Sequence, residues 1–190
     1  MQTSEQIINQ AASVIATGGT LLYPTDTIWG IGCDASNIDA IEKIYAIKQR
    51  DHSKSMLVLA LAEWVETDFR PLADLIASDR PTTVIVNPNR LAHLPAIAPN
   101  LPAADGTIGI RVPRHSLCQQ LLQRLGHPIV STSANFSGQS SPQTFSDIDP
   151  MLIQRIDYCV PNLPAFDSHC TQGSRIVRLS TDNTITIIRD

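Results

Sequence analysis

Residues 126–135 read Gly-His-Pro-Ile-Val-Ser-Thr-Ser-Ala-Asn, and this stretch shows the pattern on which the fold is built. A glycine that stops a helix is followed by a short apolar strand, and the strand by side chains that donate or accept hydrogen bonds. Residues 18–27, Gly-Gly-Thr-Leu-Leu-Tyr-Pro-Thr-Asp-Thr, repeat the same order. Hydroxyl groups are poor choices for a strand end unless they replace lost backbone bonds or face a ligand. We therefore expect a polar site where these strands end.

Helix and strand patterns alternate along the whole chain. Apolar residues at helical spacing predict helices over residues 4–17, 38–47, 72–77 and 116–125. Apolar or β-branched runs predict strands over residues 20–23, 56–61, 82–86, 107–112, 128–130, 156–160, 176–179 and 184–188. Residues 87–106 and 136–150 are predicted to be loops. The fold class is therefore α/β, with a mixed sheet and an antiparallel tail.

Size and composition limit the class of protein. The 190 residues suffice for one domain, and the net charge of −4 argues against broad coating of nucleic acid, although 14 Lys and Arg could form a local basic patch. The four cysteines, Cys33, Cys118, Cys159 and Cys170, form no C-x-x-C pair, which predicts reduced thiols. Because no leader and no bilayer-length apolar stretch is present, we expect a cytoplasmic protein without membrane contact.

Two cations end the second predicted helix. If the chain turns extended near Ile47, Lys48 and Arg50 lie on one side and bracket a polyphosphate. The alternative is that both only complement the helix C-terminus.

Arg111 lies in the middle of an apolar strand. A buried charge is costly unless it is paired, so Arg111 needs a carboxylate from the protein or from a ligand. Gly30 and Gly32 would let the backbone pass close to another group. Asp26 or Asp34 could contact a metal, but neither has a second ligand at a diagnostic spacing. No Walker-type or Gly-rich dinucleotide motif is present. The residues alone predict an α/β protein that binds an anion, with phosphate as the first candidate.

Four motifs in this order resemble the YrdC/Sua5 family. They are Tyr-Pro-Thr-Asp-Thr…Trp-Gly-Ile-Gly from residue 23, Lys-Gln-Arg at 48–50, Gly-Ile-Arg-Val-Pro-Arg-His at 109–115, and Pro-Ile-Val-Ser-Thr-Ser-Ala-Asn-Phe-Ser-Gly at 128–138. The paired K-x-R and S-x-N elements, Lys48/Arg50 and Ser133/Asn135, are the most specific. The resemblance implies a single YrdC-like domain over residues 1–190, a twisted mixed sheet flanked by helices around a positively charged cavity.

The resemblance also implies an activity, that of a threonylcarbamoyl-AMP synthase. Such an enzyme converts L-threonine, bicarbonate and ATP, with Mg²⁺, into threonylcarbamoyl-adenylate and pyrophosphate. Downstream tRNA threonylcarbamoyl-transfer proteins then modify adenosine 37 of tRNA to t6A. By position in the motifs, threonine would be bound by Thr25, Arg111, Ser131 and Ser174. Catalysis and ATP binding would fall to Lys48, Arg50, Ser133 and Asn135, with Ser141 and Arg189 as further ATP contacts.

The chain departs from the family pattern at several positions. Residues 78–81 read Ser-Asp-Arg-Pro where Trp-Pro-Gly-Pro is usual, Asp51 stands where a proline is common, and Arg175 replaces a threonine. These departures motivate an alternative, a non-catalytic paralogue that binds double-stranded or ribosomal RNA, which the net negative charge opposes. A third reading, an enzyme that handles carbamoyl phosphate on the same fold, would be expected in a longer chain.

Overall fold

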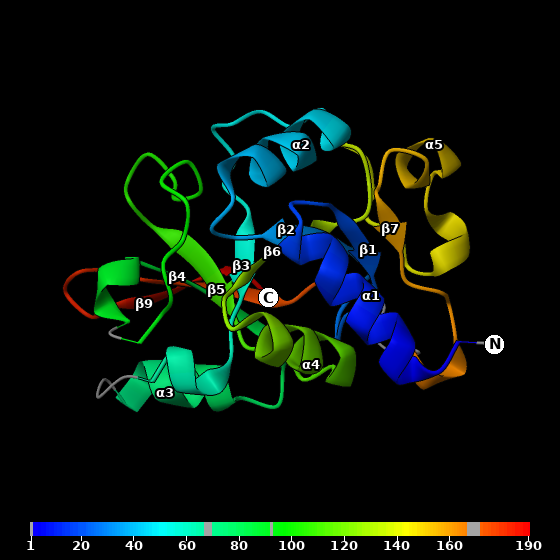
Figure 1. Cartoon of the computed structure of the whole chain (residues 1–190). Helices are drawn as coiled ribbons and strands as arrows, with labels where there is room; N and C mark the ends of the chain where they lie inside the picture. Colours follow the sequence, from blue (N-terminus) through cyan, green and yellow to red (C-terminus); the bar gives the residue numbers. More distant parts are fainter. Residues whose placement is uncertain (1, 67–69, 92, 167–171) are drawn as a thin grey trace.

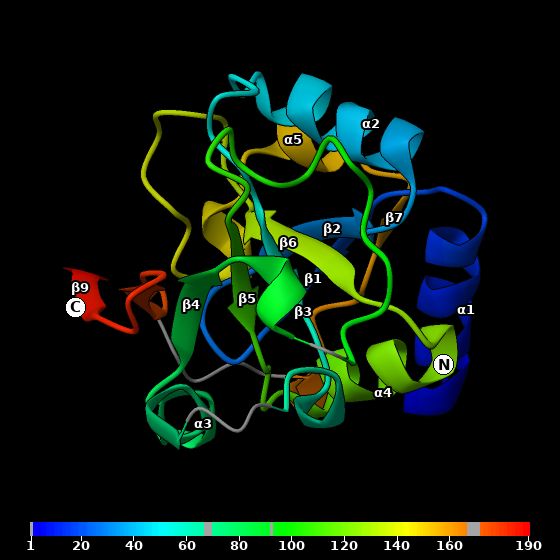
Figure 2. The same cartoon turned by 90° about the vertical axis from the view of Figure 1, so that its left-hand side faces the viewer.

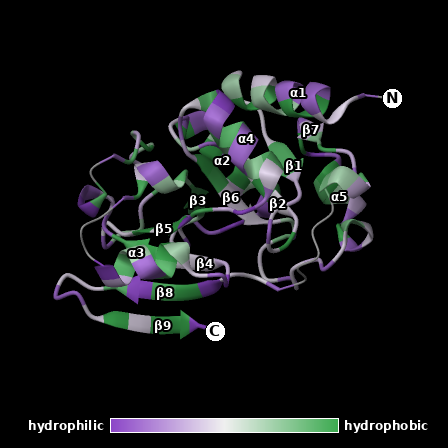
Figure 3. Ribbon diagram, turned by 90° about the horizontal axis from the view of Figure 1, so that it is seen from below, coloured by the Kyte–Doolittle hydropathy of each residue, from purple (hydrophilic) through white to green (hydrophobic). Residues whose placement is uncertain are grey.

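The structure, a computed structural model, describes residues 2–66, 70–91, 93–166 and 172–190 (Figure 1). Within this part of the chain nine strands form one mixed sheet in the order β7-β1-β2-β6-β3-β5-β4-β8-β9. The strands are β1 Leu21–Tyr23, β2 Gly30–Asp34, β3 Leu57–Leu59, β4 Thr82–Val86, β5 Ile108–Arg111, β6 Ile129–Ser133, β7 Tyr158–Cys159, β8 Arg175–Leu179 and β9 Ile185–Arg189. The β8–β9 pair is antiparallel and forms one edge of the sheet, as the sequence predicts for the tail (Figure 3).

Helices cover both faces of the sheet, as Figures 1 and 2 show. The α-helices are α1 Ser4–Ala16, α2 Ile38–Lys48, α3 Arg70–Ala77, α4 Ser116–Leu125 and α5 Pro150–Ile153. Short 3₁₀ helices lie at Ala62–Trp64, Pro88–Arg90, Phe145–Asp147 and Pro164–Phe166. In the described residues, none of the helices combines the length and the apolar character that a membrane span needs. The predicted α/β class with a twisted mixed sheet is confirmed.

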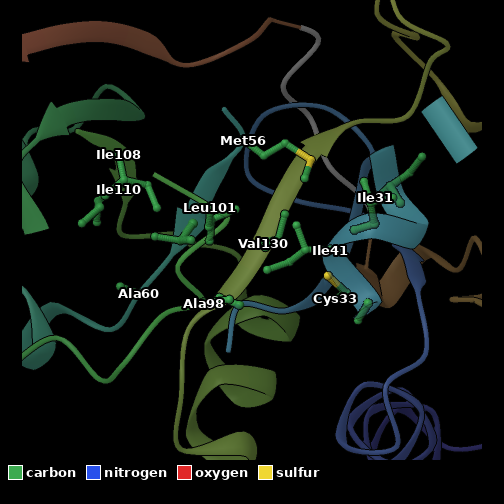
Figure 4. Close-up of a cluster of buried hydrophobic side chains, with 14 of the residues drawn as sticks. Ile31, Cys33, Ile41, Met56, Ala60, Ala98, Leu101, Ile108, Ile110 and Val130 are labelled. Atoms are coloured by element: carbon green, nitrogen blue, oxygen red, sulfur yellow. The ribbon is translucent and has the colours of Figure 1, made fainter. Parts of the chain in front are cut away.

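Two layers of core follow from the alternation of side chains along the central strands. Leu21, Leu59 and Ile129 pack with α1 and α4 on one face. Their neighbours in sequence point to the opposite face and pack beneath α2, where Ile31, Cys33, Ile41 and Val130 meet (Figure 4). Cys33, Cys118 and Cys159 are free thiols, and Cys170 lies outside the described residues.

Local capping explains where the main helices begin and end. Thr3 and Gln6 form a capping box, in which the Thr3 hydroxyl accepts a bond from Gln6 N–H at 3.2 Å. Asn37 caps α2 by accepting from Ala40 N–H at 3.0 Å. At the other end of α2, Gln49 adopts a left-handed conformation with φ 52°. This residue turns the chain sharply between Lys48 and Arg50.

Two sequence-based expectations need correction near the centre of the sheet. No strand was predicted over residues 30–34, yet β2 lies there and joins β1 to β6. The strand before Ser131 was expected to end at Val130, but β6 continues through Ser133. The glycines of β2 have weak strand preference, and pairing with neighbouring strands overrides it here. Ser131 to Ser133 are therefore strand residues, and the turn after β6 begins at Ala134.

Gly32 shows why β2 contains glycine. Its backbone pairs with Leu21 of β1 and Ser131 of β6. A Cβ atom at this position would lie 2.3 Å from the Val130 carbonyl oxygen and 2.9 Å from the Tyr23 ring. Only a residue without a side chain fits between these two neighbours.

We therefore predict that Gly32→Ala lowers the free energy of unfolding by about 3 kcal/mol, because overpacking forces β2 and β6 apart. Gly30→Ala is the matched control in the same strand. Its added methyl would meet the Ser131 hydroxyl at 3.1 Å, and that side chain can rotate, so a loss of about 1 kcal/mol or less is expected. Urea unfolding measures both, and equal losses would contradict the packing argument.

Asp157 joins the segment before β7 to β1. Its Oδ2 accepts bonds from the backbone N–H of Thr20 at 2.7 Å and from the Thr20 hydroxyl at 2.9 Å. The backbone N–H bond is the main reason why the pKa of the Asp157 carboxyl is lowered in the folded chain. The stabilisation is therefore present above the pKa of the unfolded chain and is lost as the pH falls through the lower folded pKa.

We predict that Asp157→Ala lowers the free energy of unfolding by about 1 kcal/mol near neutral pH. The difference from the wild type should shrink as the pH falls below about 4, where the carboxyl of the unfolded chain is protonated. Urea unfolding across this range measures it. A difference that does not change with pH would show that the carboxylate charge has no part in the contact.

Candidate functional site

A cavity of about 340 Å³ opens over the middle of the sheet. Its volume falls in the range of small-molecule sites, about 300–1,000 Å³. Eight of the ten residues predicted for the site line it, although they come from stretches far apart in the sequence: Thr25, Arg50, Arg111, Ser131, Ser133, Ser141, Ser174 and Arg189. The other two, Lys48 and Asn135, are not among the lining residues. The sequence pattern therefore identified most of one spatial site.

The charged residues that line the cavity are arginines. Arg50, Arg111 and Arg189 line it, and no Asp or Glu is among the lining residues of the described chain. Arg50 holds its own loop, because Nε donates to the Lys54 carbonyl at 2.8 Å and Nη2 to the Ser55 carbonyl at 2.9 Å. Arg189 donates through Nε and Nη2 to the Ser174 carbonyl. Three arginines suit an anionic ligand, and the positive charge of the cavity as a whole stays a prediction.

The turn between β1 and β2 is held by its hydroxyl groups. Thr25 Oγ1 lies 2.9 Å from Thr27 Oγ1 and donates to the Ile28 carbonyl at 2.8 Å. Thr83 and Ser174 also line the cavity, and their hydroxyls are 2.7 Å apart. Because these hydroxyls are held by each other, they present a fixed set of polar groups rather than mobile ones.

Arg111 is buried at one wall of the cavity and is 4% exposed. Its Nη1 donates to Thr27 Oγ1 at 2.6 Å, and its Nη2 lies 3.6 Å from Asp26 Oδ1. The predicted need for a carboxylate is thus met within the protein by Asp26, which the sequence suggested only as a metal contact. The predicted bond to a ligand carboxylate stays a prediction. In the described residues no group of three or more His, Cys, Asp or Glu could hold a metal ion.

Ser131 and Ser133 lie on β6 and pair with Gly32 and Gly30 of β2. A Cβ atom on Gly30 would lie 3.1 Å from Ser131 Oγ. Both glycines therefore permit the close backbone approach that was predicted for them. The sequence did not identify the apolar lining residues Leu57, Ile85 and Ile176. An apolar strand residue that faces the cavity cannot be told from one that faces the core by the sequence pattern alone.

The K-x-R and S-x-N elements meet in space. Lys48 and Arg50 do not both line the cavity, so the predicted bracket around a polyphosphate is wrong for Lys48, because the left-handed Gln49 turns the chain between them. Lys48 Nζ donates to the carbonyl oxygens of Ser133 and Asn135. Burial, and secondarily the charge of Arg50, lower the pKa of the Lys48 ammonium to about 7. Asn135 Nδ2 donates to the carbonyls of Phe136 and Gln139, both at 2.9 Å. Both side chains therefore bind backbone beside the cavity.

Comparison with known proteins places this geometry in a family. The family model for Sua5, YciO and YrdC, described as "Telomere recombination", matches residues 13–190. The threonylcarbamoyl-AMP synthase of Pseudoalteromonas translucida is 32% identical over 170 residues, which cover 83% of this chain and 87% of the relative. That of Nitrosococcus oceani is 34% identical over 160 residues, which cover 82% of this chain and 85% of the relative.

A solved structure agrees with the fold. The crystal structure of E. coli YciO superposes with a TM-score of 0.76 at 24% identity and covers 100% of this chain and 91% of that one. The implied fold is confirmed, and the sequence matches settle the relationship: the chain belongs to the Sua5/YciO/YrdC family.

Proposed function

We propose that this chain is a threonylcarbamoyl-AMP synthase, which forms threonylcarbamoyl-adenylate and pyrophosphate from L-threonine, bicarbonate and ATP. The observation that carries the proposal is the cavity itself, which gathers eight predicted site residues from distant stretches of the chain. Three arginines among its lining residues provide for the carboxylate and the phosphates of such substrates. The names of the curated relatives support the same activity.

Arg111 and the hydroxyl groups near it form the proposed threonine subsite. The guanidinium is fixed by Thr27 and Asp26, so its remaining N–H groups are oriented before a ligand arrives. Thr25, Ser131 and Ser174 add hydroxyl groups that bind the amino acid. A guanidinium held in this way loses little side-chain entropy when a carboxylate binds.

Arg50 and Ser133 form the proposed phosphate subsite, with Ser141 and Arg189 as further contacts of ATP. The amine of threonine and bicarbonate condense to a carbamate with loss of water. A carbamate oxygen then attacks the α-phosphorus, the bond to the bridging oxygen breaks, and pyrophosphate leaves. The protein orients the two reactants and offsets the negative charge that develops at the phosphorus.

Mg²⁺ is proposed to enter with ATP. The described lining residues supply hydroxyl and carbonyl oxygens but no carboxylate. Mg²⁺ in nucleotide sites keeps several waters and binds largely through the phosphates, which suits this set of ligands. When bound, the ion would add positive charge at the phosphates.

The residues that depart from the family pattern do not line the cavity. Asp51, residues 78–81 and Arg175 are absent from the lining residues of the described chain. Asp79 instead pairs with Arg114 at 3.0 Å, and Asp51 accepts a bond from Ser53 N–H at 2.7 Å. This favours the synthase over the RNA-binding paralogue. A contact with RNA, transfer to downstream tRNA-modifying proteins, a single domain over residues 1–190 and a cytoplasmic location stay predictions.

The first test is mass detection of threonylcarbamoyl-adenylate from the purified chain. Product should require threonine and bicarbonate, and Ser133→Ala should reduce its rate by about a hundredfold if the hydroxyl serves the developing charge. Ser146→Ala, an exposed serine outside the cavity, is the control and should match the wild type. Absence of the adenylate with the wild type, together with RNA affinity that saturating ATP and threonine do not reduce, would favour the paralogue.

The second test separates the two subsites. Arg111→Lys keeps the charge beside Asp26 but loses the fork that binds a carboxylate in two places, so the KM for threonine should rise about tenfold. The KM for ATP should stay within about twofold. Arg178→Lys, at an exposed pair with Asp105, is the matched control. An equal rise in both KM values would place the threonine carboxylate elsewhere.

A further inference from the structure

Lys48 is a cation of the K-x-R element, yet it does not face the cavity. Its side chain is buried, with 1% exposed, and the residue is absent from the cavity lining. Its Nζ donates to the Ser133 and Asn135 carbonyls. Arg50, two residues later, does line the cavity. Gln49 adopts a left-handed conformation between them, so the side chains of Lys48 and Arg50 point in different directions.

The two carbonyls converge because the chain makes a tight turn after β6. Asn135 N–H donates to the Ser133 carbonyl at 2.9 Å, which closes a three-residue turn around Ala134. Ala134 N–H donates to the Trp29 carbonyl at 3.0 Å. The carbonyls of the residues on either side of Ala134 are then bound by one nitrogen, that of Lys48. A lysine is suited to this place because its nitrogen offers several N–H donors at one point.

A further bond fixes the same segment to the end of α2. The backbone carbonyl of Lys48 accepts from Ser137 N–H at 2.9 Å. Lys48 thus binds the segment 133–137 through both its side chain and its backbone. The Asn135 amide closes the next loop on Phe136 and Gln139. Beyond that loop the chain reaches Ser141, which lines the cavity.

Moving Lys48 Nζ to a phosphate would remove these bonds. The Ser133 carbonyl would keep only the Asn135 N–H as donor, and the Asn135 carbonyl would lose its bond to Lys48. A buried acceptor left without a donor costs about 1–3 kcal/mol, and a partly buried one such as the Asn135 carbonyl costs less. The lowered pKa of Lys48 does not change this conclusion, because the neutral amine still has two N–H groups for the two carbonyls.

We propose that Lys48 is a positioning residue, which holds the turn after β6 so that Ser133 and Ser141 face the cavity, and that it does not bind the phosphates. The part of this inference that concerns activity rests on the proposed function. The part that concerns the turn can be tested without substrate.

The first experiment is amide hydrogen exchange of the ligand-free protein. Lys48→Met, which keeps the length of the side chain but removes the donors, should speed exchange in peptides that span residues 131–139 by at least about tenfold. Lys43→Met is the matched control, because Lys43 is an exposed lysine of the same helix, and it should leave this segment unchanged. Unchanged exchange in folded Lys48→Met would overturn the proposal. This readout holds even if the wild type forms no adenylate.

The second experiment separates positioning from phosphate binding in the kinetics. Lys48→Met should lower kcat about tenfold or more, because the displaced Ser133 hydroxyl serves the charge that develops in the transition state. The KM for ATP should stay within about twofold, because Arg50 still binds the phosphates of the bound ATP. A tenfold rise in the KM for ATP with unchanged kcat would overturn the proposal.

A measurement on the wild type covers the case in which Lys48→Met does not fold. In isotope-labelled protein, NMR couplings across hydrogen bonds should connect Lys48 Nζ with the Ser133 and Asn135 carbonyl carbons. These couplings should persist when a non-hydrolysable ATP analogue and threonine are added. Their replacement by a coupling to phosphorus would overturn the proposal.

Discussion

The antiparallel pairing of β2 with β6 is the contact on which the site depends. It places Ser131 and Ser133 in the interior of the sheet opposite Gly32 and Gly30, and a side chain at Gly32 would collide with the Val130 carbonyl. Since β6 also pairs with β3 at Ile129, Val130 and Ser131, the backbone of Ser131 is held from both sides, and that of Ser133 from the side of β2. The hydroxyl groups of Ser131 and Ser133 are therefore placed at the cavity by a strand rather than by a loop. Two reactants can only be oriented for reaction by groups whose positions are fixed.

Three buried or half-buried cations are stabilised by different partners. The difference indicates which of them are available to bind a ligand. Lys48 is bound by two backbone carbonyls, and Arg50 by two carbonyls of its own loop. Arg111 is bound by a hydroxyl and lies near a carboxylate. A guanidinium has enough N–H groups to serve the protein and a ligand together. Lys48 is buried and absent from the cavity lining, and its nitrogen binds the turn. In this account the arginines bind substrate and the lysine builds the site.

Much of this arrangement can be predicted from the sequence, and the misses have physical causes. α2 and β5 have clear periodic or apolar patterns, and the family motifs select eight residues that do share a cavity. β2 was missed because Gly-Ile-Gly-Cys-Asp lacks a strand pattern, and only its neighbours make it a strand. The direction of Lys48 was missed for a related reason. It depends on Gln49 adopting a left-handed conformation, which no residue of the Lys-Gln-Arg motif signals.

The central claim is that one cavity, walled by Arg50, Arg111 and β6, seats the nucleotide and the amino acid together. A crystal structure of the chain with a non-hydrolysable ATP analogue and L-threonine tests it most directly. The account predicts the threonine carboxylate at Arg111, phosphate oxygens at Arg50 and Ser133, and Lys48 Nζ still on its two carbonyls. Both ligands bound outside this cavity, or an ammonium of Lys48 turned onto the phosphates, would contradict it.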